Sequence, residues 1–194
     1  MIKRGEKMSK KLSEMSLEEL WQLFPIFLTP HRDEWEKWYQ EEETFLKSIL
    51  DCTMDIYHIG STSIKNIWAK PIIDILVDVP ITADLILIKE RLIQNGYTCM
   101  SEGQNRLSFN KGYTEQGFAQ KVFHLHLRYN QDHDELYFRD YLNEHENIAH
   151  EYEKLKLMLW KKYKHNRDGY TNAKTEFIQK YTHLAKIKYK GRYE

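Results

Sequence analysis

Cysteine is scarce in this chain of 194 residues, which contains only Cys52 and Cys99. The two residues form no C-x-x-C motif, and their number is too small for a disulfide framework. Free, buried thiols in a reducing compartment explain them best. The sequence therefore predicts a cytoplasmic protein.

Long apolar runs are also missing. No segment approaches the roughly 18 consecutive apolar residues of a membrane span, and the charged N-terminal segment lacks the apolar run of a signal peptide. We therefore expect no membrane partner. Residues 1–15 are predicted to be a flexible leader. Because no linker rich in Pro, Gly or Ser interrupts the rest, residues 16–194 are predicted to form a single domain.

An excess of charge of either sign is absent, since 29 Lys and Arg residues balance 29 Asp and Glu residues. Residues 151–194 are nevertheless basic, with 12 Lys and Arg against 5 Asp and Glu, an excess of +7. One hypothesis is nucleic-acid binding that is salt-sensitive and lost when Lys161, Lys162 and Lys164 are neutralised. A solvated helix face explains the same charges, and no aromatic-rich RNA motif or zinc knuckle accompanies them. We therefore expect no nucleic-acid partner.

The chain does contain clear hydrophobic periodicity. Apolar residues at spacings of three and four predict an amphipathic helix that ends near Leu50, and Ser16 with Glu19 matches a capping box at the start of an earlier helix. The sequence predicts helices at about 16–25, 31–50, 82–95, 135–145, 148–164 and 171–189, strands at about 55–59, 71–79, 97–100, 106–110 and 118–129, and a polar loop at 111–116. The predicted fold class is α+β, a mixed β-sheet flanked by N-terminal and C-terminal helices.

One block between residues 58 and 77 has a recognisable pattern. It consists of H-I-G-S-T at 58–62 and K-P-I-I-D-I-L-V at 70–77. This block resembles the GrpB family, and three further segments agree with the family in the same order: H-L-H-L at 124–127, F-R-D-Y-L at 138–142 and Y-T-N-A-K-T-E-F at 170–177. The resemblance implies a nucleotidyltransferase-like fold. GrpB-like domains also resemble the C-terminal extension of some bacterial dephospho-CoA kinases.

The resemblance to nucleotidyltransferases implies a metal site in this block. In that superfamily a strand ends at Gly-Ser, and the next strand presents two acids at i and i+2, which project from one face and hold Mg²⁺ against nucleotide phosphates. Here Gly60-Ser61 and Asp74 fit the pattern, but Leu76 stands in place of the second acid. A single carboxylate is a poor Mg²⁺ site, so this departure argues against standard two-metal nucleotidyl transfer.

Two histidines offer a different metal site. His124 and His126 lie on the same side of the predicted strand at 118–129, and either would face Asp74 if the two strands are neighbours. Asp74, His124 and His126, with or without His58, would suit Zn²⁺ or Mn²⁺ better than Mg²⁺. The alternative is that each histidine is a hydrogen-bonded residue of a half-buried strand. The sequence leaves both interpretations open.

The Gly-Ser turn also predicts a phosphate site. Gly60 lets the backbone amides approach a ligand, and the hydroxyl groups of Ser61 and Thr62 are candidates to bind phosphate. Lys70, at the entrance of the following strand, would offset the negative charge of the ligand. An ordinary Ser/Thr turn is compatible with this role.

Two functions from different classes follow. The first is a nucleotidyltransferase-like enzyme that binds a nucleotide or another phosphorylated small molecule and uses Asp74, with a divalent metal ion (Mg, Mn or Zn), for transfer. The second is a non-catalytic ligand- or partner-binding module that lost this chemistry with the second acid. Leu76 favours the second function, and Asp74 with the paired histidines favours the first.

Tyr170 and Lys174, four residues apart on one helix face, either close the pocket or simply pack. The sequence leaves the oligomeric state open.

Overall fold

The computed structural model describes residues 10–129 and 133–193. Its elements confirm the α+β class. They are α1 (Leu17–Leu23), α2 (Glu34–Ile49), β1 (Asp55–Ile59), β2 (Ile73–Val79), α3 (Leu85–Gln94), β3 (Thr98–Glu102), β4 (Arg106–Thr114), β5 (Gly117–Tyr129), α4 (Asp134–Glu144), α5 (Glu146–Tyr163), α6 (Arg167–Asn172) and α7 (Thr175–Lys188), with 3₁₀ turns η1 at Leu12–Glu14 and η2 at Ser61–Ser63.

The five strands form one mixed sheet in the order β1-β2-β5-β4-β3. β2 and β5 run parallel, and every other neighbouring pair is antiparallel. Asp74 of β2 lies opposite Ile59 of β1 on one side and opposite His124 of β5 on the other. Residues paired in this way project from the same face of a sheet. The sheet therefore brings Asp74 and His124 side by side, as the sequence predicted for neighbouring strands.

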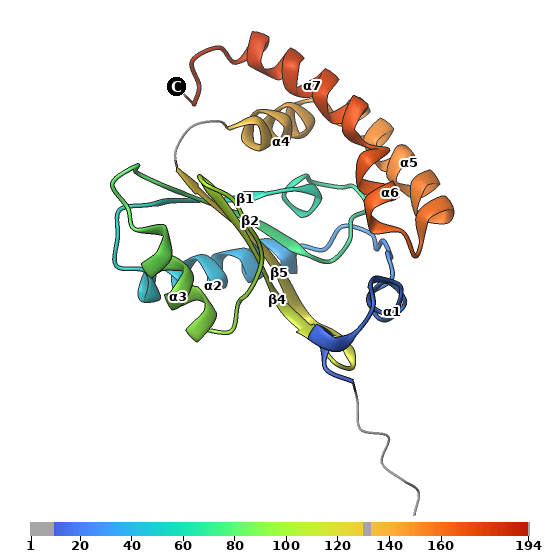
Figure 1. Cartoon of the computed structure of the whole chain (residues 1–194). Coiled ribbons are helices and arrows are strands. Elements are labelled where there is room, and N and C mark those ends of the chain that lie inside the picture. Colours follow the sequence, from blue (N-terminus) through green and yellow to red (C-terminus); the bar gives the residue numbers. More distant parts are fainter. Residues whose placement is uncertain (1–9, 130–132, 194) are drawn as a thin grey trace, which may run out of the picture.

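The two faces of the sheet are covered differently (Figure 1). Helices α2 and α3 lie on one face, where Trp35 and Leu92 pack against the alternate residues Ile73, Ile75 and Val77 of β2 in the main hydrophobic core. Helices α4 to α7 lie on the opposite face. That face carries Asp74 and His124, so the candidate site lies between the sheet and the C-terminal helices.

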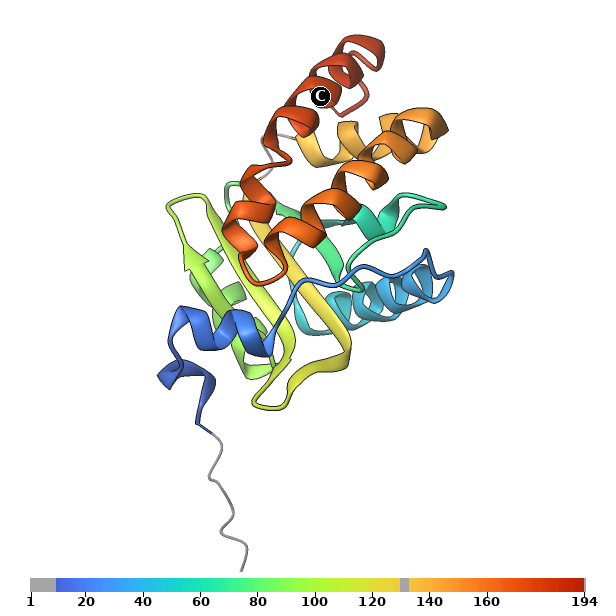
Figure 2. The same cartoon turned by 90° about the vertical axis from the view of Figure 1, so that its right-hand side faces the viewer.

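The N-terminal helix packs on the long hairpin of β4 and β5 (Figure 2), where the ring of Phe24 contacts those of Tyr113 and Phe118. The predicted capping box is present, because the Ser16 side chain accepts a hydrogen bond from Glu19 N and the Glu19 carboxylate accepts one from Ser16 N. Of the predicted flexible leader, residues 1–9 lie outside the described residues. The remainder contains η1 and is attached to α1 by an ion pair of Lys10 with Glu19 at 2.7 Å.

The hairpin is longer than the sequence predicted. Residues 111–116 were expected to form a polar loop, but β4 continues to Thr114 and β5 begins at Gly117. The pairing is irregular between Lys111 and Tyr113, where Gly112 adopts φ +90° and a Cβ atom would lie 2.3 Å from Lys121 O. A glycine bulge thus lets a polar segment stay in the sheet. It also places Tyr113 on a strand rather than in a loop.

The last predicted helix is two helices. The sequence predicted one helix at 171–189, whereas α6 begins at Arg167 and α7 begins at Thr175. Asn166 caps α6, because its side-chain oxygen accepts a hydrogen bond from Gly169 N at 2.8 Å. Lys174 lies at the joint between the two helices.

Within residues 10–129 and 133–193, no helix has the length and apolar character that a membrane span requires. The cytoplasmic location stays a prediction.

Candidate functional site

The chain turns directly against Asp74 where β1 ends. Gly60 adopts φ +71° and ψ −169°, a conformation that L-amino acids rarely adopt. A Cβ atom on Gly60 would lie 2.2 Å from Asp74 Oδ2 and 2.8 Å from its Cγ. The turn is held from the other side by Ser63, whose hydroxyl donates to Gly60 O at 2.7 Å. Only glycine therefore fits where the Gly-Ser turn passes the carboxylate.

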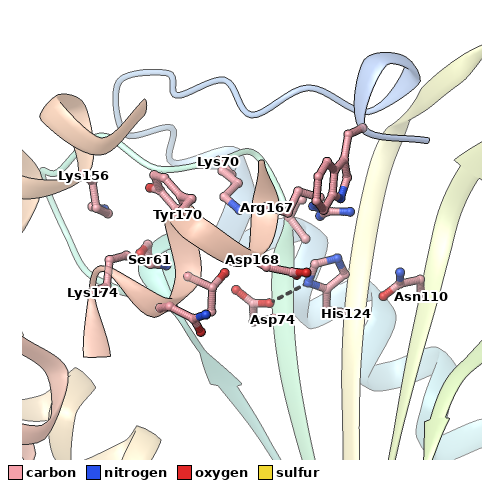
Figure 3. A pocket seen from close by; sticks show the side chains of 14 residues that line it. Ser61, Lys70, Asp74, Asn110, His124, Lys156, Arg167, Asp168, Tyr170 and Lys174 are labelled. Carbon is pink, nitrogen blue, oxygen red and sulfur yellow. Dashed lines mark hydrogen bonds and ion pairs between the residues drawn. The ribbon is translucent and has the colours of Figure 1, made fainter. Parts of the chain in front are cut away.

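Asp74 ends a chain of hydrogen bonds that begins on α6, and Figure 3 shows its last step, between His124 and Asp74. Arg167 Nη2 donates to the Tyr113 hydroxyl at 2.8 Å, and that hydroxyl lies 2.8 Å from His124 Nε2. His124 Nδ1 lies 3.1 Å from Asp74 Oδ1. Because a guanidinium group only donates, the Tyr113 O–H is free to donate to Nε2, which leaves the ring proton on Nδ1 for Asp74. The network thus assigns one tautomer to His124 and orients the carboxylate.

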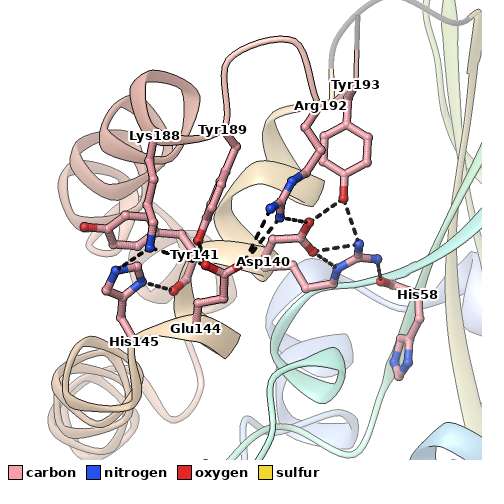
Figure 4. Close-up of polar contacts among 10 residues, drawn as sticks. His58, Asp140, Tyr141, Glu144, His145, Lys188, Tyr189, Arg192 and Tyr193 are labelled. Carbon is pink, nitrogen blue, oxygen red and sulfur yellow. Dashed lines mark hydrogen bonds and ion pairs between the residues drawn. The ribbon is translucent and has the colours of Figure 1, made fainter.

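A second polar network fastens the backbone just before the turn (Figure 4). Arg139 of α4 donates from Nη1 to His58 O at 2.9 Å and from Nε to Asp140 Oδ1 at 2.9 Å. Asp140 Oδ2 in turn accepts from Arg192 Nη1 at 3.0 Å and from the Tyr193 hydroxyl at 2.5 Å. The C-terminal segment is therefore connected to the end of β1, two residues before Gly60.

A cavity of about 660 Å³ opens beside Asp74. Four basic side chains line it, Lys70, Lys156, Arg167 and Lys174, and we call it the cationic chamber (Figure 3). The described carboxylates that line it are those of Asp74 and Asp168. With histidine neutral and the three lysines protonated, the lining therefore carries an excess of two positive charges.

Aromatic rings and a backbone carbonyl hold the lysines in place. The ammonium groups of Lys70 and Lys174 lie 4.6 and 4.5 Å from the centroid of the Tyr170 ring. Lys156 is only 1% exposed, and its ammonium group donates to Trp68 O at 2.5 Å. Cation–π contacts and one carbonyl offset only part of the cost of placing three charges close together.

The pKa values of these lysines reflect their surroundings. Burial, together with the positive charges of Lys174 and Arg167, lowers the pKa of Lys70 to about 7. Burial, with Lys174 as the next cause, lowers the pKa of Lys156 to about 7. Burial also lowers the pKa of Lys174 to about 8. The chamber therefore holds amines that release protons near neutral pH unless an anion stabilises their charge.

Asp74, in contrast to the lysines, keeps its charge at neutral pH. Burial opposes its charge, but the hydrogen bond from His124 and electrostatic attraction by His124, His126 and Lys70 outweigh burial and keep the pKa of Asp74 below its ordinary value. The carboxylate is consequently ionised throughout the neutral range. It contributes a fixed negative charge at the edge of a positive chamber.

Several residues predicted from the sequence do meet here. Gly60 packs against Asp74, and Ser61, Lys70 and Asp74 line the same chamber. Thr62 does not join them, although it was predicted to bind phosphate. Its side chain is buried at 3% exposure and its hydroxyl donates to Ile72 O at 3.2 Å. Among the hydroxyl groups predicted for phosphate, the prediction therefore rests on Ser61.

The predicted histidine sites are dispersed. His58 lies opposite Ile75, on the face that packs against α2, where it hydrogen-bonds Thr62 at 3.0 Å and Glu36 at 3.3 Å. His58 and Asp74 are therefore on opposite faces of the sheet. His126 lies opposite Leu76, two residues farther along the same strands than the pair of Asp74 and His124, and it is not part of the lining of the cationic chamber.

The donor set of a metal-dependent nucleotidyltransferase is incomplete here. In the part of the chain that the structure describes, no group of three or more His, Cys, Asp or Glu side chains could hold a metal ion. Both ring nitrogens of His124 are already in hydrogen bonds, and Leu76 is fully buried at the position of the second acid. The predicted set of Asp74, His124 and His126 thus does not assemble, and these residues do not fit a two-metal centre.

Three residues of the site were not predicted. Tyr113 was assigned to a loop, Arg167 to the segment between two helices, and Lys156 to a helix without any role. A lysine on the buried face of an amphipathic helix is a usable signal for Lys156, because lysine is almost never fully buried without a partner. Tyr170 and Lys174 both line the pocket, and Tyr170 also packs in the interior against Ile26 and Leu159, so both alternatives hold for Tyr170.

The fold and the site define a class. This is an α+β protein in which a strand that ends at a Gly-Ser turn packs against a carboxylate of the next strand of a mixed sheet. The chain belongs to the GrpB family, because the family model described as GrpB protein matches residues 25–184.

Relatives agree with this assignment. The chain is 37% identical over 160 residues to glutamate-rich protein GrpB of Alkalihalophilus pseudofirmus, covering 79% of this chain and 91% of that protein. It is 33% identical over 190 residues to the UPF0157 protein YqkA of Bacillus subtilis, covering 94% of this chain but only 54%, about half, of that relative. The crystal structure of conserved protein GrpB from Enterococcus faecalis is similar, with a TM-score of 0.74 and 32% identity, covering 84% of this chain and 99% of that chain.

Proposed function

We propose that this protein binds a nucleotide or another phosphorylated small molecule, with the phosphate in the cationic chamber. One observation carries the proposal. Lys70, Lys156, Arg167 and Lys174 come from separate parts of the chain and line one cavity beside a single turn. Packing alone gives no reason to gather four cations in one place.

Electrostatics explains why an anion would bind there. Burial lowers the pKa of all three lysines, and neighbouring positive charges lower those of Lys70 and Lys156 further, so these charges destabilise the empty chamber. A phosphate group carries about −1.5 to −2 charges at neutral pH and would offset the excess. The planar guanidinium of Arg167 suits two phosphate oxygens, and the turn at Ser61 offers backbone amides and a hydroxyl. Binding and neutralisation of the chamber would therefore occur together.

Metal-dependent transfer by the same site is the competing proposal. It is supported by Asp74, an ionised carboxylate at the end of the Gly-Ser turn. The buried Leu76 weighs against it, because a Mg, Mn or Zn ion would have Asp74 as its one acidic ligand in the predicted pair of positions. We therefore favour ligand binding without nucleotidyl transfer, the second function that the sequence suggested.

The test is isothermal calorimetry of pyrophosphate, ATP and CTP, each with and without Mg²⁺, Mn²⁺ or Zn²⁺. The proteins are the wild type, Lys174→Gln and Asp74→Asn. The control is Lys161→Gln, which removes an exposed lysine of α5 outside the chamber. Lys174→Gln is expected to weaken anion binding about tenfold, in line with the loss of one charge-assisted hydrogen bond, and Lys161→Gln to change it little.

Asp74→Asn separates the two proposals. If cations alone bind the anion, removing a negative charge from the chamber leaves the affinity unchanged or raises it, with no metal required. If a metal ion bridges Asp74 and the phosphate, the same change abolishes metal-dependent binding and supports the transfer hypothesis. A wild type that binds none of the three anions would overturn the proposed function.

A further inference from the structure

A second cavity adjoins the cationic chamber on the other side of Asp74. Its volume is about 530 Å³, and it is lined by parts of α4, α5 and α7 together with the Gly-Ser turn. Ser61, Asp74 and Lys174 line both cavities. The two spaces therefore meet at the turn, and one molecule can extend from one into the other.

The charge of the second cavity differs from that of the first. Its lining contains three acids, Asp74, Asp134 and Glu135, and three bases, Arg139, Lys174 and Lys186. Asp134 is ion-paired with Lys186. The formal charge is therefore balanced, and we call this cavity the neutral chamber. A second phosphate would gain little there compared with the cationic chamber.

Helix α7 gives the neutral chamber its hydrogen-bonding groups. Gln179, Thr182 and His183 line it at spacings of three and four residues, so they lie on one face of the helix. Phe138 and Tyr152 add aromatic surface and are almost fully buried. Amide, hydroxyl and imidazole groups around an apolar floor suit an uncharged ring that carries its own donors and acceptors.

We propose that the neutral chamber binds the uncharged heterocyclic part of the same ligand whose phosphate occupies the cationic chamber. This inference rests on the proposed function and deepens it, since it names the ligand class as a phosphorylated compound with a polar ring, such as a nucleotide. Asp74, Ser61 and Lys174 lie where the two parts of that ligand join. Gln179 and His183 are then the residues that determine affinity for the ring.

The experiment compares a probe without a ring with probes that have one. Pyrophosphate, ATP and CTP are titrated into the wild type, Gln179→Ala and His183→Ala. Both substituted side chains are exposed at the protein surface, so the variants are expected to fold. The control is Lys180→Ala, an exposed change on the same helix that does not line the chamber.

The proposal predicts that each chamber variant weakens ATP or CTP binding by about three- to tenfold, the effect of one lost hydrogen bond, and leaves pyrophosphate binding unchanged. Lys180→Ala is expected to change neither. Two results would contradict ring binding in the neutral chamber: equal effects on pyrophosphate and the nucleotides, or nucleotide affinity that neither substitution changes. Neither result would contradict phosphate binding in the cationic chamber. A wild type that binds neither pyrophosphate nor nucleotide would overturn the proposed function, and this inference with it.

Discussion

Gly60 and Asp74 are in direct contact across the end of β1 and the start of β2, so close that a Cβ atom on Gly60 would lie 2.2 Å from Asp74 Oδ2. The contact connects the two parts of the motif that the sequence shows as separate, the Gly-Ser turn and the acid of the next strand. It also keeps the carboxylate at the junction of the cationic and neutral chambers. The glycine is therefore required by the position of the acid, as well as by its own backbone conformation.

Gly60→Ala is expected to lower the free energy of unfolding by roughly 3 kcal/mol or more, because a left-handed backbone and a steric clash both add to the cost. Gly96→Ala is the matched control. Gly96 also has a positive φ, +89°, but a Cβ atom added there would meet no atom within 4 Å, so a loss of about 1 kcal/mol is expected. Urea unfolding of both variants measures the difference. Equal losses would show that the contact with Asp74 has no energetic weight.

Tyr113→Phe is expected to break the hydrogen-bond chain between Arg167 and His124. The loss of two partly buried hydrogen bonds corresponds to about 1–2 kcal/mol of stability. In the wild type, ¹⁵N NMR is expected to show the proton of the neutral His124 ring on Nδ1, and in the variant a larger share on Nε2. Tyr57→Phe, on β1, is expected to leave the His124 signals unchanged. A wild-type ring protonated on Nε2 would contradict the network.

Much of the fold was predictable because the hydrophobic pattern is regular. The α+β class and the capping box at Ser16 follow from local signals. Strand alternation placed a histidine opposite Asp74 only if the two strands are neighbours, and the sheet meets that condition with His124. The extension of β4 was missed because residues 111–116 are polar, and the Gly112 bulge that retains them depends on contact with Lys121. The start of α6 was missed because its cap, Asn166, lies before the predicted start, and the break between α6 and α7 falls at Ala173 and Lys174, inside the predicted helix.

The candidate site was only partly predictable, since most of its charges come together through tertiary structure. Asp74, Ser61 and Lys70 were found because they belong to one sequence motif. Lys156 and Arg167 were not, because nothing in the local sequence shows that α5 and α6 converge on β2. Thr62 was wrongly included in the site because it belongs to the motif. Its buried hydroxyl instead donates a hydrogen bond to Ile72 O in the protein interior.

Lys156→Met is expected to change how stability depends on pH. Below about pH 7, Lys156 is protonated in both the folded and unfolded protein, and the folded wild type bears the full cost of a buried charge. Between pH 7 and the unfolded pKa of 10.5, only the unfolded state keeps the proton, so the wild type gains stability relative to the variant as pH rises. From pH 6 to pH 9 this gain is expected to reach about 3 kcal/mol.

Urea unfolding at several pH values measures this difference between the wild type and Lys156→Met. Lys154→Met, an exposed change on the same helix, is the control and is expected to show no such trend. A constant difference between the wild type and Lys156→Met across this range would mean that Lys156 stays charged in its buried position. The cationic chamber would then hold its full positive charge even without a ligand.

Phosphate binding is expected to take up protons. At pH 8 the amines of Lys70 and Lys156, whose pKa values are lowered to about 7, are largely neutral in the free protein, and a bound phosphate restores their charge and raises their pKa. AMP is a suitable probe, because its phosphate has a second pKa of about 6 and keeps its charge above neutral pH. Its affinity is therefore expected to fall roughly tenfold or more from pH 7 to pH 9.

Calorimetry in buffers of different ionisation enthalpy measures the number of protons taken up at pH 8. The wild type is expected to take up about one proton or more on binding AMP, and Lys70→Met fewer, because one of the amines that regain a proton is gone. Lys161→Met, outside the chamber, is expected to match the wild type. AMP binding without proton uptake, at an affinity independent of pH, would place the phosphate elsewhere on the protein, since no anion can occupy the cationic chamber without shifting the equilibrium of these amines.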